Sequence, residues 1–242
     1  MFISSSENFS SHIAGKCADL INQAYDQYDM NSDPAHWQLQ RYAYIEDFWG
    51  NPKGFSKGLE PFGFVATDID NPKIAYIVFR GTSSVEDWMT NAAVSQEDHA
   101  WGKVESGFNE LYLQLSRTIL PAIAALKPFK VYVCGHSLGG ALATLCAADL
   151  HLSKEIDTIV AMYSFASPRV GDSSFSKNFS GEIFETFRIV NTEDIVPTLP
   201  TPVLGGLNYT HVGDAICFTG NTGSIVGNHS MSGVYSDMFA HA

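Results

Sequence analysis

A segment in the middle of the chain constrains its fold more than any other. Residues 131–134 are apolar and predict a buried strand, and residues 138–152 are rich in alanine and leucine and predict a buried helix. The sequence Gly-His-Ser-Leu-Gly, residues 135–139, joins the two. A strand that enters a helix through such a turn is typical of a nucleophile elbow, which holds a serine hydroxyl at the edge of a sheet. The segment therefore marks Ser137 as a candidate nucleophile.

The residue types around Ser137 suit a sharp elbow. Gly135 and Gly139 lack a Cβ atom, so the turn can be tight and the strand and helix can approach closely. The N-terminus of the helix adds a positive dipole where an oxyanion would form. A plain glycine-rich turn is the alternative, but strand, turn and helix together favour the elbow. His136 should point elsewhere on an elbow, so we expect it to be structural rather than the base.

Short strands alternate with helices over most of the chain. Residues 31–60, rich in proline, glycine and aromatic residues, are predicted to be ordered but irregular. The alternation elsewhere implies an α/β fold with a mostly parallel central sheet and helices on both faces. No composition break marks a linker, so residues 1–242 are predicted to form one domain. Helices are predicted near residues 8–28, 106–126 and 138–152, and strands at Gly63–Thr67, Ile74–Phe79, Lys130–Cys134, Ile159–Phe165 and Phe184–Val190.

A nucleophilic serine needs a histidine as base, and the histidine needs an acid to hold its tautomer. In α/β-hydrolases the acid follows the serine in the chain, and the histidine follows the acid. Asp194 lies just past an apolar strand, where its carboxylate can reach the edge of the sheet, and Asp172 is the competing candidate. Two histidines, His211 and His229, are candidates for the base.

The elbow is one of five motifs that occur in order along the chain. They stand, in order, at Tyr76–Thr82, Asp87–Asn91, Gly135–Gly140, Phe165–Gly171 and Asn191–Pro200. With these motifs the chain resembles the class 3 (fungal-type) lipase family of the α/β-hydrolase fold. Two positions depart from the family pattern: Ala166 replaces a glycine, and Glu105 stands where the family often has a histidine.

The resemblance implies which acid and base complete the triad. It identifies Asp194 as the acid and His229 as the base. His229 precedes Tyr235 much as the family's catalytic histidine precedes an aromatic residue. His211 matches a family segment in which the histidine is not the base, so we expect it to be a structural hydrogen-bonding group.

Two donors should form the oxyanion hole. One is the backbone N–H of Leu138, the residue after the nucleophile, and the other should come from the loop after the strand that ends at Phe79. The resemblance places the second donor at Thr82, through its backbone N–H and its hydroxyl. Arg80 is expected to form a buried structural ion pair rather than to act as a catalytic cation.

These residues together predict ester hydrolysis through an acyl-enzyme, with no metal and no organic cofactor. The resemblance implies a triacylglycerol lipase or carboxylesterase. A phospholipase A1 or a feruloyl-type esterase with the same mechanism is the alternative. A lipase-like binding module without a triad is a further alternative, but candidates for the serine, the acid, the base and both oxyanion donors are all present.

Charge and hydropathy limit the partners. The formal net charge is −12, which disfavours binding to nucleic acid. No apolar run is long enough for a stable membrane span, so the expected partner is a lipid or other ester substrate, including one at a lipid–water interface. No secretory signal is visible, which is expected of a cytoplasmic protein or of a secreted one whose signal has been removed. The four cysteines are expected to be mostly buried free thiols, with a Cys17–Cys217 bridge as the alternative.

The segment that follows Thr82 predicts a short amphipathic helix. Ser83 and Glu86 have the spacing of a capping box. An apolar face then forms at helical spacing. We expect residues 83–92 to form a lid over Ser137; the alternative is an apolar face packed permanently into the core. The face consists of Val85, Trp88, Met89 and Ala92.

Overall fold

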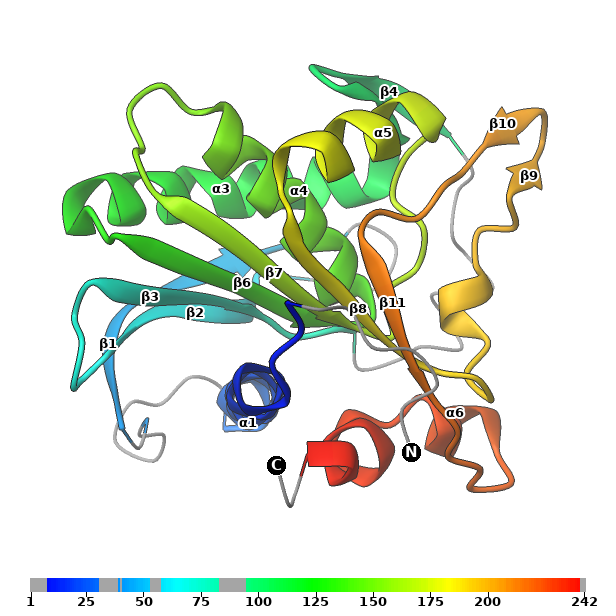
Figure 1. The fold of residues 1–242 in the computed structure, drawn as a ribbon, viewed down its shortest axis with the longest axis horizontal. Coiled ribbons are helices and arrows are strands. Elements are labelled where there is room, and N and C mark those ends of the chain that lie inside the picture. The colour runs from blue at the N-terminus through cyan, green and yellow to red at the C-terminus, as the bar shows by residue number, and fades with distance from the viewer. Residues whose placement is uncertain (1–7, 31–38, 40, 53–57, 83–94, 240–242) are drawn as a thin grey trace.

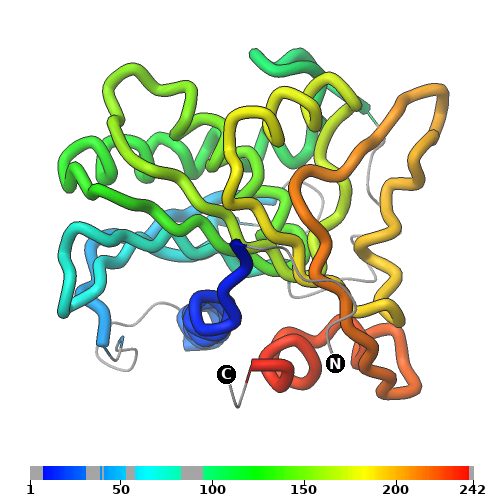
Figure 2. Tube along the Cα trace, in the orientation of Figure 1, coloured from blue at the N-terminus to red at the C-terminus, as the bar shows by residue number. Residues whose placement is uncertain are grey.

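The computed structural model describes residues 8–30, 39, 41–52, 58–82 and 95–239 (Figures 1 and 2). Its centre is a seven-stranded sheet in the order β1-β2-β3-β6-β7-β8-β11. The strands are β1 (Tyr42–Gly50), β2 (Glu60–Asp68), β3 (Ile74–Phe79), β6 (Lys130–His136), β7 (Ile159–Phe165), β8 (Glu185–Asn191) and β11 (Asp214–Phe218).

The sheet is parallel from β3 to β11 and antiparallel only at the β1–β2–β3 edge. The central strands are nearly continuous apolar runs because both faces of a parallel sheet are covered. Their carboxyl ends lie at one edge, where ligand sites form in open α/β sheets. Three of these ends are Phe79, His136 and Asn191.

Helices cover both faces of the sheet (Figure 1). On one face lie α3 (Ser106–Leu126), α4 (Leu138–Leu152) and α5 (Ser173–Glu182), packed into the larger apolar core. On the other lie α1 (Ser11–Asp29) and two C-terminal turns, η2 (Met231–Tyr235) and η3 (Asp237–Phe239), which share a second core.

Helix α1 shows how the sequence sets this packing. Ser10 caps its N-terminus, because the serine side chain accepts a hydrogen bond from the backbone N–H of Ile13 at 3.3 Å. Small and apolar side chains at helical spacing turn one face to the sheet. This stripe, which includes Ala14, Cys17, Ile21 and Ala24, is fully buried.

Shorter elements complete the fold. They are the hairpin of β4 (Gln96–His99) and β5 (Gly102–Glu105), the 3₁₀ turn η1 (Val196–Thr198), the small hairpin of β9 (Val203–Leu204) and β10 (Leu207–Asn208), and the one-turn helix α6 (Ile225–Asn228).

The mostly parallel α/β sheet is confirmed, and so are the helices over 106–126 and 138–152. The prediction of irregular structure over residues 31–60 is wrong for Tyr42–Gly50, which form strand β1. Two register shifts break the alternation of β1, and only Phe48 and Gly50 of this edge strand are buried. The sequence of the strand therefore shows no regular alternation of apolar residues. Within the described part of the chain, no helix is long and apolar enough to cross a membrane.

All four cysteines lie in the described part of the chain, and each is a free thiol. Cys17 and Cys134 are buried against each other between α1 and β6. The alternative Cys17–Cys217 bridge is therefore not formed.

Candidate active site

Ser137 occupies the turn between β6 and α4 in a conformation that is rare for a residue with a side chain. Its φ is 59° and its ψ is −128°. Such positive-φ strain persists only where surrounding contacts enforce it. The backbone N–H of Ser137 donates to the carbonyl of Phe165 at 2.9 Å, and its own carbonyl accepts from Gly140 at 2.9 Å. The backbone therefore has the geometry of the predicted elbow.

Glycines allow the strands and helix to meet at this turn. A Cβ atom on Gly135 would lie 2.1 Å from the carbonyl oxygen of Gly139, and one on Gly139 would lie 2.4 Å from that of Arg80. A Cβ on Gly81 would lie 2.8 Å from the Cβ of Ser137. The loop after β3 thus rests directly against the elbow, which brings Thr82 into the neighbourhood of Ser137.

Asp194 and His229 form a buried hydrogen-bonded pair. The Nδ1 of His229 lies 2.7 Å from the Oδ2 of Asp194, and the side chains are 2% and 0% exposed. The carboxylate also accepts from the backbone N–H of Val196, at 2.9 Å, through Oδ1. A carboxylate held in this way keeps the proton of the imidazole on Nδ1 and leaves Nε2 free to accept another.

Two buried atoms at this edge have no hydrogen-bond partner among the described residues: Oγ of Ser137 and Nε2 of His229. Buried polar atoms are normally paired, and an unpaired one needs an explanation. A serine hydroxyl and an imidazole nitrogen are a nucleophile and a base, and their contact commonly tightens only when substrate binds. The arrangement suits transfer of the serine proton to His229.

Tyr235 belongs to the site, although the sequence indicated it only as an aromatic landmark. Its hydroxyl donates to Oδ2 of Asp194 at 2.7 Å and accepts from the backbone N–H of Asn191 at 3.0 Å. Burial raises the pKa of Tyr235 well above its usual value, and the neighbouring Asp194 raises it further, so the hydroxyl keeps its proton. Tyr235 therefore fixes the orientation of the Asp194 carboxylate, the candidate acid. The aromatic residue after His229 was the only signal for it in the sequence.

The two candidate oxyanion donors come from different segments. Leu138 is buried at the N-terminus of α4, and Thr82 is partly buried just after Gly81. Arg80 is fully buried behind this loop. Its guanidinium pairs with Glu60 at 2.9 Å and donates to the carbonyl of Gly81 at 2.6 Å, so it forms the predicted ion pair and also holds the loop.

The competing residues have other partners. Asp172 caps α5, since its Oδ1 accepts from the backbone N–H of Phe175 at 2.8 Å. His211 donates from Nε2 to the carbonyl of Pro197 at 2.7 Å, so this nitrogen cannot accept a proton. Burial, with a contribution from Arg188, lowers the pKa of His211 to about 3. Both residues have structural roles in this fold.

The candidate lid residues Val85, Trp88 and Met89 lie outside the described residues, so the lid stays a prediction. No group of three or more potential metal ligands occurs in the part of the chain that the structure describes.

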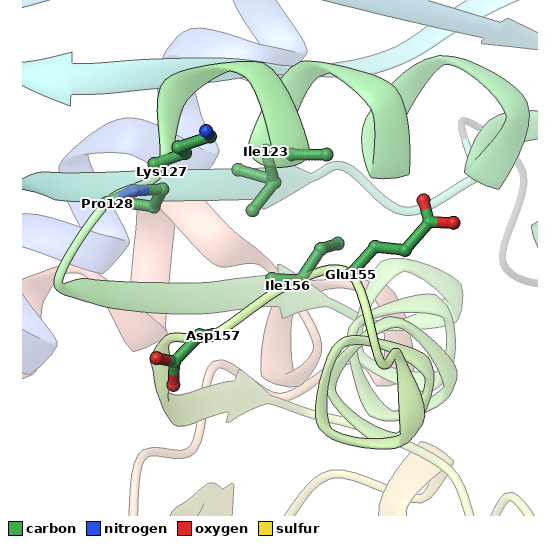
Figure 3. Close-up of a pocket in the computed structure, with 7 residues that line it drawn as sticks. Ile123, Lys127, Pro128, Glu155, Ile156 and Asp157 are labelled. Atoms are coloured by element: carbon green, nitrogen blue, oxygen red, sulfur yellow. The ribbon is translucent and has the colours of Figure 1, made fainter.

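A pocket of about 340 Å³ lies between the end of α3 and the loop before β7 (Figure 3). Its lining includes Lys127, Pro128 and Asp157, which precede β6 and β7. The pocket is therefore at the amino edge of the sheet, opposite the candidate site, and it contains none of the candidate residues.

Comparison with known proteins agrees with this geometry. A family model described as "Lipase (class 3)" matches residues 76–204. A lipase of Rhizomucor miehei is 37% identical over 162 residues, covering 63% of this chain and 44% of that protein. A chloroplastic phospholipase A(1) of Arabidopsis thaliana is 31% identical over 172 residues, covering 59% of this chain and 38% of that protein. The chain thus spans less than half the length of these two relatives.

The fold is also found in solved structures. That of the triacylglyceride lipase of Rhizomucor miehei superimposes with a TM-score of 0.70 at 25% identity, covering 92% of this chain and 84% of the other. The family match covers more than half of this chain, including the elbow and the candidate acid. Sequence family, fold and local geometry agree, and the chain belongs to the class 3 lipase family.

Proposed function

We propose that this chain is a serine carboxylic-ester hydrolase that acts through an acyl-enzyme. The observation that carries the proposal is the buried His229–Asp194 pair at the carboxyl edge of the sheet, which Ser137 shares on its strained backbone turn. Nε2 of His229 and Oγ of Ser137 both lack a hydrogen-bond partner among the described residues. Membership of the class 3 lipase family supports the same reading.

In the proposed reaction, Oγ of Ser137 attacks the ester carbonyl while Nε2 of His229 takes the serine proton. The backbone N–H groups of Leu138 and Thr82 bind the negative oxygen of the tetrahedral intermediate. His229 then gives its proton to the leaving alcohol. Water, activated by His229, releases the acid from the acyl-enzyme. Asp194 stays ionised throughout and stabilises the imidazolium.

A lipid ester fits the surroundings of the site. Ile195 directly follows the acid, and Ile225 and Val226 stand on the one-turn helix before the base. All three are exposed, at 42%, 53% and 55%. Exposed apolar side chains gathered beside a reactive centre are typical of a surface that meets lipid. We propose that this rim, defined by Ile195, Ile225 and Val226, contacts aggregated substrate.

The activity itself is tested by covalent labelling. A fluorophosphonate probe should label the protein at Ser137, because the activated hydroxyl attacks phosphorus as it would attack an ester carbonyl. Labelling should be lost after heat denaturation. A folded protein that hydrolyses no ester and takes up no probe would contradict the proposal and favour a binding module.

A panel of esters then distinguishes the substrate classes. The leading candidate substrate is a triacylglycerol or partial glyceride. The similarity to the Arabidopsis phospholipase A(1) makes the sn-1 ester of a phospholipid the second candidate. Emulsified tributyrin should be cleaved faster than phosphatidylcholine vesicles or a feruloyl ester. Faster release of the sn-1 fatty acid from phosphatidylcholine would favour the second candidate.

The rim has its own test. The double variant Ile225→Ser, Val226→Ser should lose about tenfold or more of its activity on emulsified tributyrin, because it loses apolar area that lipid would bury. Hydrolysis of soluble p-nitrophenyl butyrate should not change. Phe184→Ser is the matched control, since Phe184 is 78% exposed but precedes β8 at the opposite edge of the sheet. Equal emulsion activity in the double variant and the control would rule out a role for the rim.

A further inference from the structure

A chain of hydrogen bonds connects the loop after β3 to the backbone of His229. The backbone N–H of Gly81 donates to the hydroxyl of Tyr25, on α1, at 3.0 Å. That hydroxyl lies 2.8 Å from Nδ1 of His136, and Nε2 of His136 lies 2.9 Å from the carbonyl oxygen of His229. The chain joins one neighbour of Thr82 to the residue proposed as the base.

The direction of every bond in this chain is fixed by its two ends. The carbonyl of His229 can only accept, so His136 must carry its proton on Nε2. The N–H of Gly81 can only donate, so the hydroxyl of Tyr25 accepts there. When His136 is neutral with its proton on Nε2, its Nδ1 can only accept, so the hydroxyl of Tyr25 donates to it. The neutral imidazole of His136 therefore has a single tautomer in this arrangement.

The surroundings keep both linking side chains uncharged. Burial lowers the pKa of His136 well below its usual value, and the neighbouring His229 lowers it further. Burial raises the pKa of Tyr25 to about 12. The ring of His136 also packs against that of His229, with the centroids 4.7 Å apart. Neither side chain can change its proton count near neutral pH without breaking the chain.

The hydrogen bonds link three segments that lie far apart in the sequence. Gly81 follows β3, Tyr25 stands near the end of α1, and His229 belongs to the C-terminal segment. A second contact holds the C-terminal segment to the same helix: Nδ2 of Asn22 donates to Oγ of Ser236 at 2.8 Å. Helix α1 thus supports both the oxyanion loop, which is the loop after β3 that contains Gly81 and Thr82, and the C-terminal segment that contains His229.

We propose that Tyr25 and His136 are positioning residues that hold the oxyanion loop and the base in one fixed arrangement. The proposal rests on the proposed ester hydrolysis. Its chemical consequence is preorganisation: the donors to the oxyanion and the acceptor of the serine proton are oriented together before substrate arrives. Neither residue touches the reacting atoms.

The first variant is Tyr25→Phe, which keeps the ring and removes the hydroxyl. It leaves the N–H of Gly81 and Nδ1 of His136 unpaired. Because the oxyanion loop and His229 are then held less firmly, we expect kcat to fall by about tenfold. KM for p-nitrophenyl butyrate should stay unchanged, because substrate contacts are intact. Tyr163→Phe is the matched control, since Tyr163 is also buried under α1 but interacts with the backbone of Ser10, at the far end of the helix.

A double-mutant cycle separates this role from a merely structural one. His136→Gln can place an amide N–H near the position of Nε2, for the carbonyl of His229, but it has no acceptor at the position of Nδ1, where Tyr25 donates. If the two side chains act as one chain, the double variant should lose no more kcat than the worse single variant. The NMR spectrum of the wild-type imidazole supplies a readout without catalysis, and it should show His136 protonated on Nε2 alone.

The outcomes are distinguishable from failure of the proposed function. A wild type that neither reacts with a fluorophosphonate nor cleaves the ester overturns both proposals. If the wild type does react, three results would overturn the positioning role of Tyr25 and His136 while leaving the proposed hydrolysis intact. They are full kcat in Tyr25→Phe, additive losses in the double-mutant cycle, and a proton on Nδ1 of His136. Equal losses of kcat in Tyr25→Phe and Tyr163→Phe would also overturn the positioning role, since both variants would then act only through the packing of α1.

Discussion

Replacing Ser137 with alanine is expected to lower kcat for ester hydrolysis on the order of 10⁶-fold, the loss that removal of a triad nucleophile produces. The variant should fold as well as the wild type. Oγ of Ser137 is buried and has no hydrogen-bond partner in the described ranges, so its removal leaves no other group unpaired. The midpoint of thermal unfolding should therefore stay the same or rise slightly, and the fluorophosphonate should no longer label the protein.

A matched control removes a similar hydroxyl elsewhere in the sheet. Ser164, in β7, is fully buried, and its Oγ also has no partner among the described residues. Ser164→Ala should keep wild-type kcat and full labelling. Turnover in Ser137→Ala at the wild-type rate would end the assignment of the nucleophile, whereas equal loss in both variants would point to a structural effect at the centre of the sheet.

Replacing His229 with alanine should be nearly as damaging, with a loss on the order of 10⁶-fold, because triad members act as a unit and their effects do not add. This variant should also be less stable. It removes one of three partners of the buried carboxylate of Asp194, and an unpaired buried group costs about 1–3 kcal/mol. Steady-state kinetics and thermal unfolding measure the two effects.

His211→Ala is the control for the base. His211 is half-buried and also hydrogen-bonded, but its partner is a backbone carbonyl in the turn after Asp194. The variant should lose stability to a similar extent and keep catalysis. If folded His211→Ala were inactive and His229→Ala active, the base would have been misassigned.

The parts of the site that the sequence predicted are those encoded locally. The elbow was visible because strand, glycines and helix are contiguous around Ser137. The order of acid and base along the chain, together with the family motifs, indicated Asp194 and His229, which the structure brings into contact.

The parts that the sequence did not predict depend on tertiary contacts. Tyr25 lies at one position of an amphipathic helix, and nothing in its neighbours shows that its hydroxyl meets Gly81 and His136. The hydrogen bond from Tyr235 to Asp194 joins two segments of the chain that meet only in the folded protein. Strand β1 was missed because edge position and bulges remove the apolar period on which strand prediction depends.

The order of the central strands has a consequence for altering this protein. Ser137 follows β6 and Asp194 follows β8, with β7 between them. Neighbouring strands are about 4.8 Å apart, so the two residues leave the sheet roughly 10 Å from each other. The serine and aspartate side chains can bridge this gap with one imidazole hydrogen-bonded between them. Backbone pairing, and not the side chains around the substrate, sets that separation. Under the proposed function, loops and rim residues can therefore be exchanged to change which ester is accepted while the spacing of the proposed nucleophile and acid is conserved.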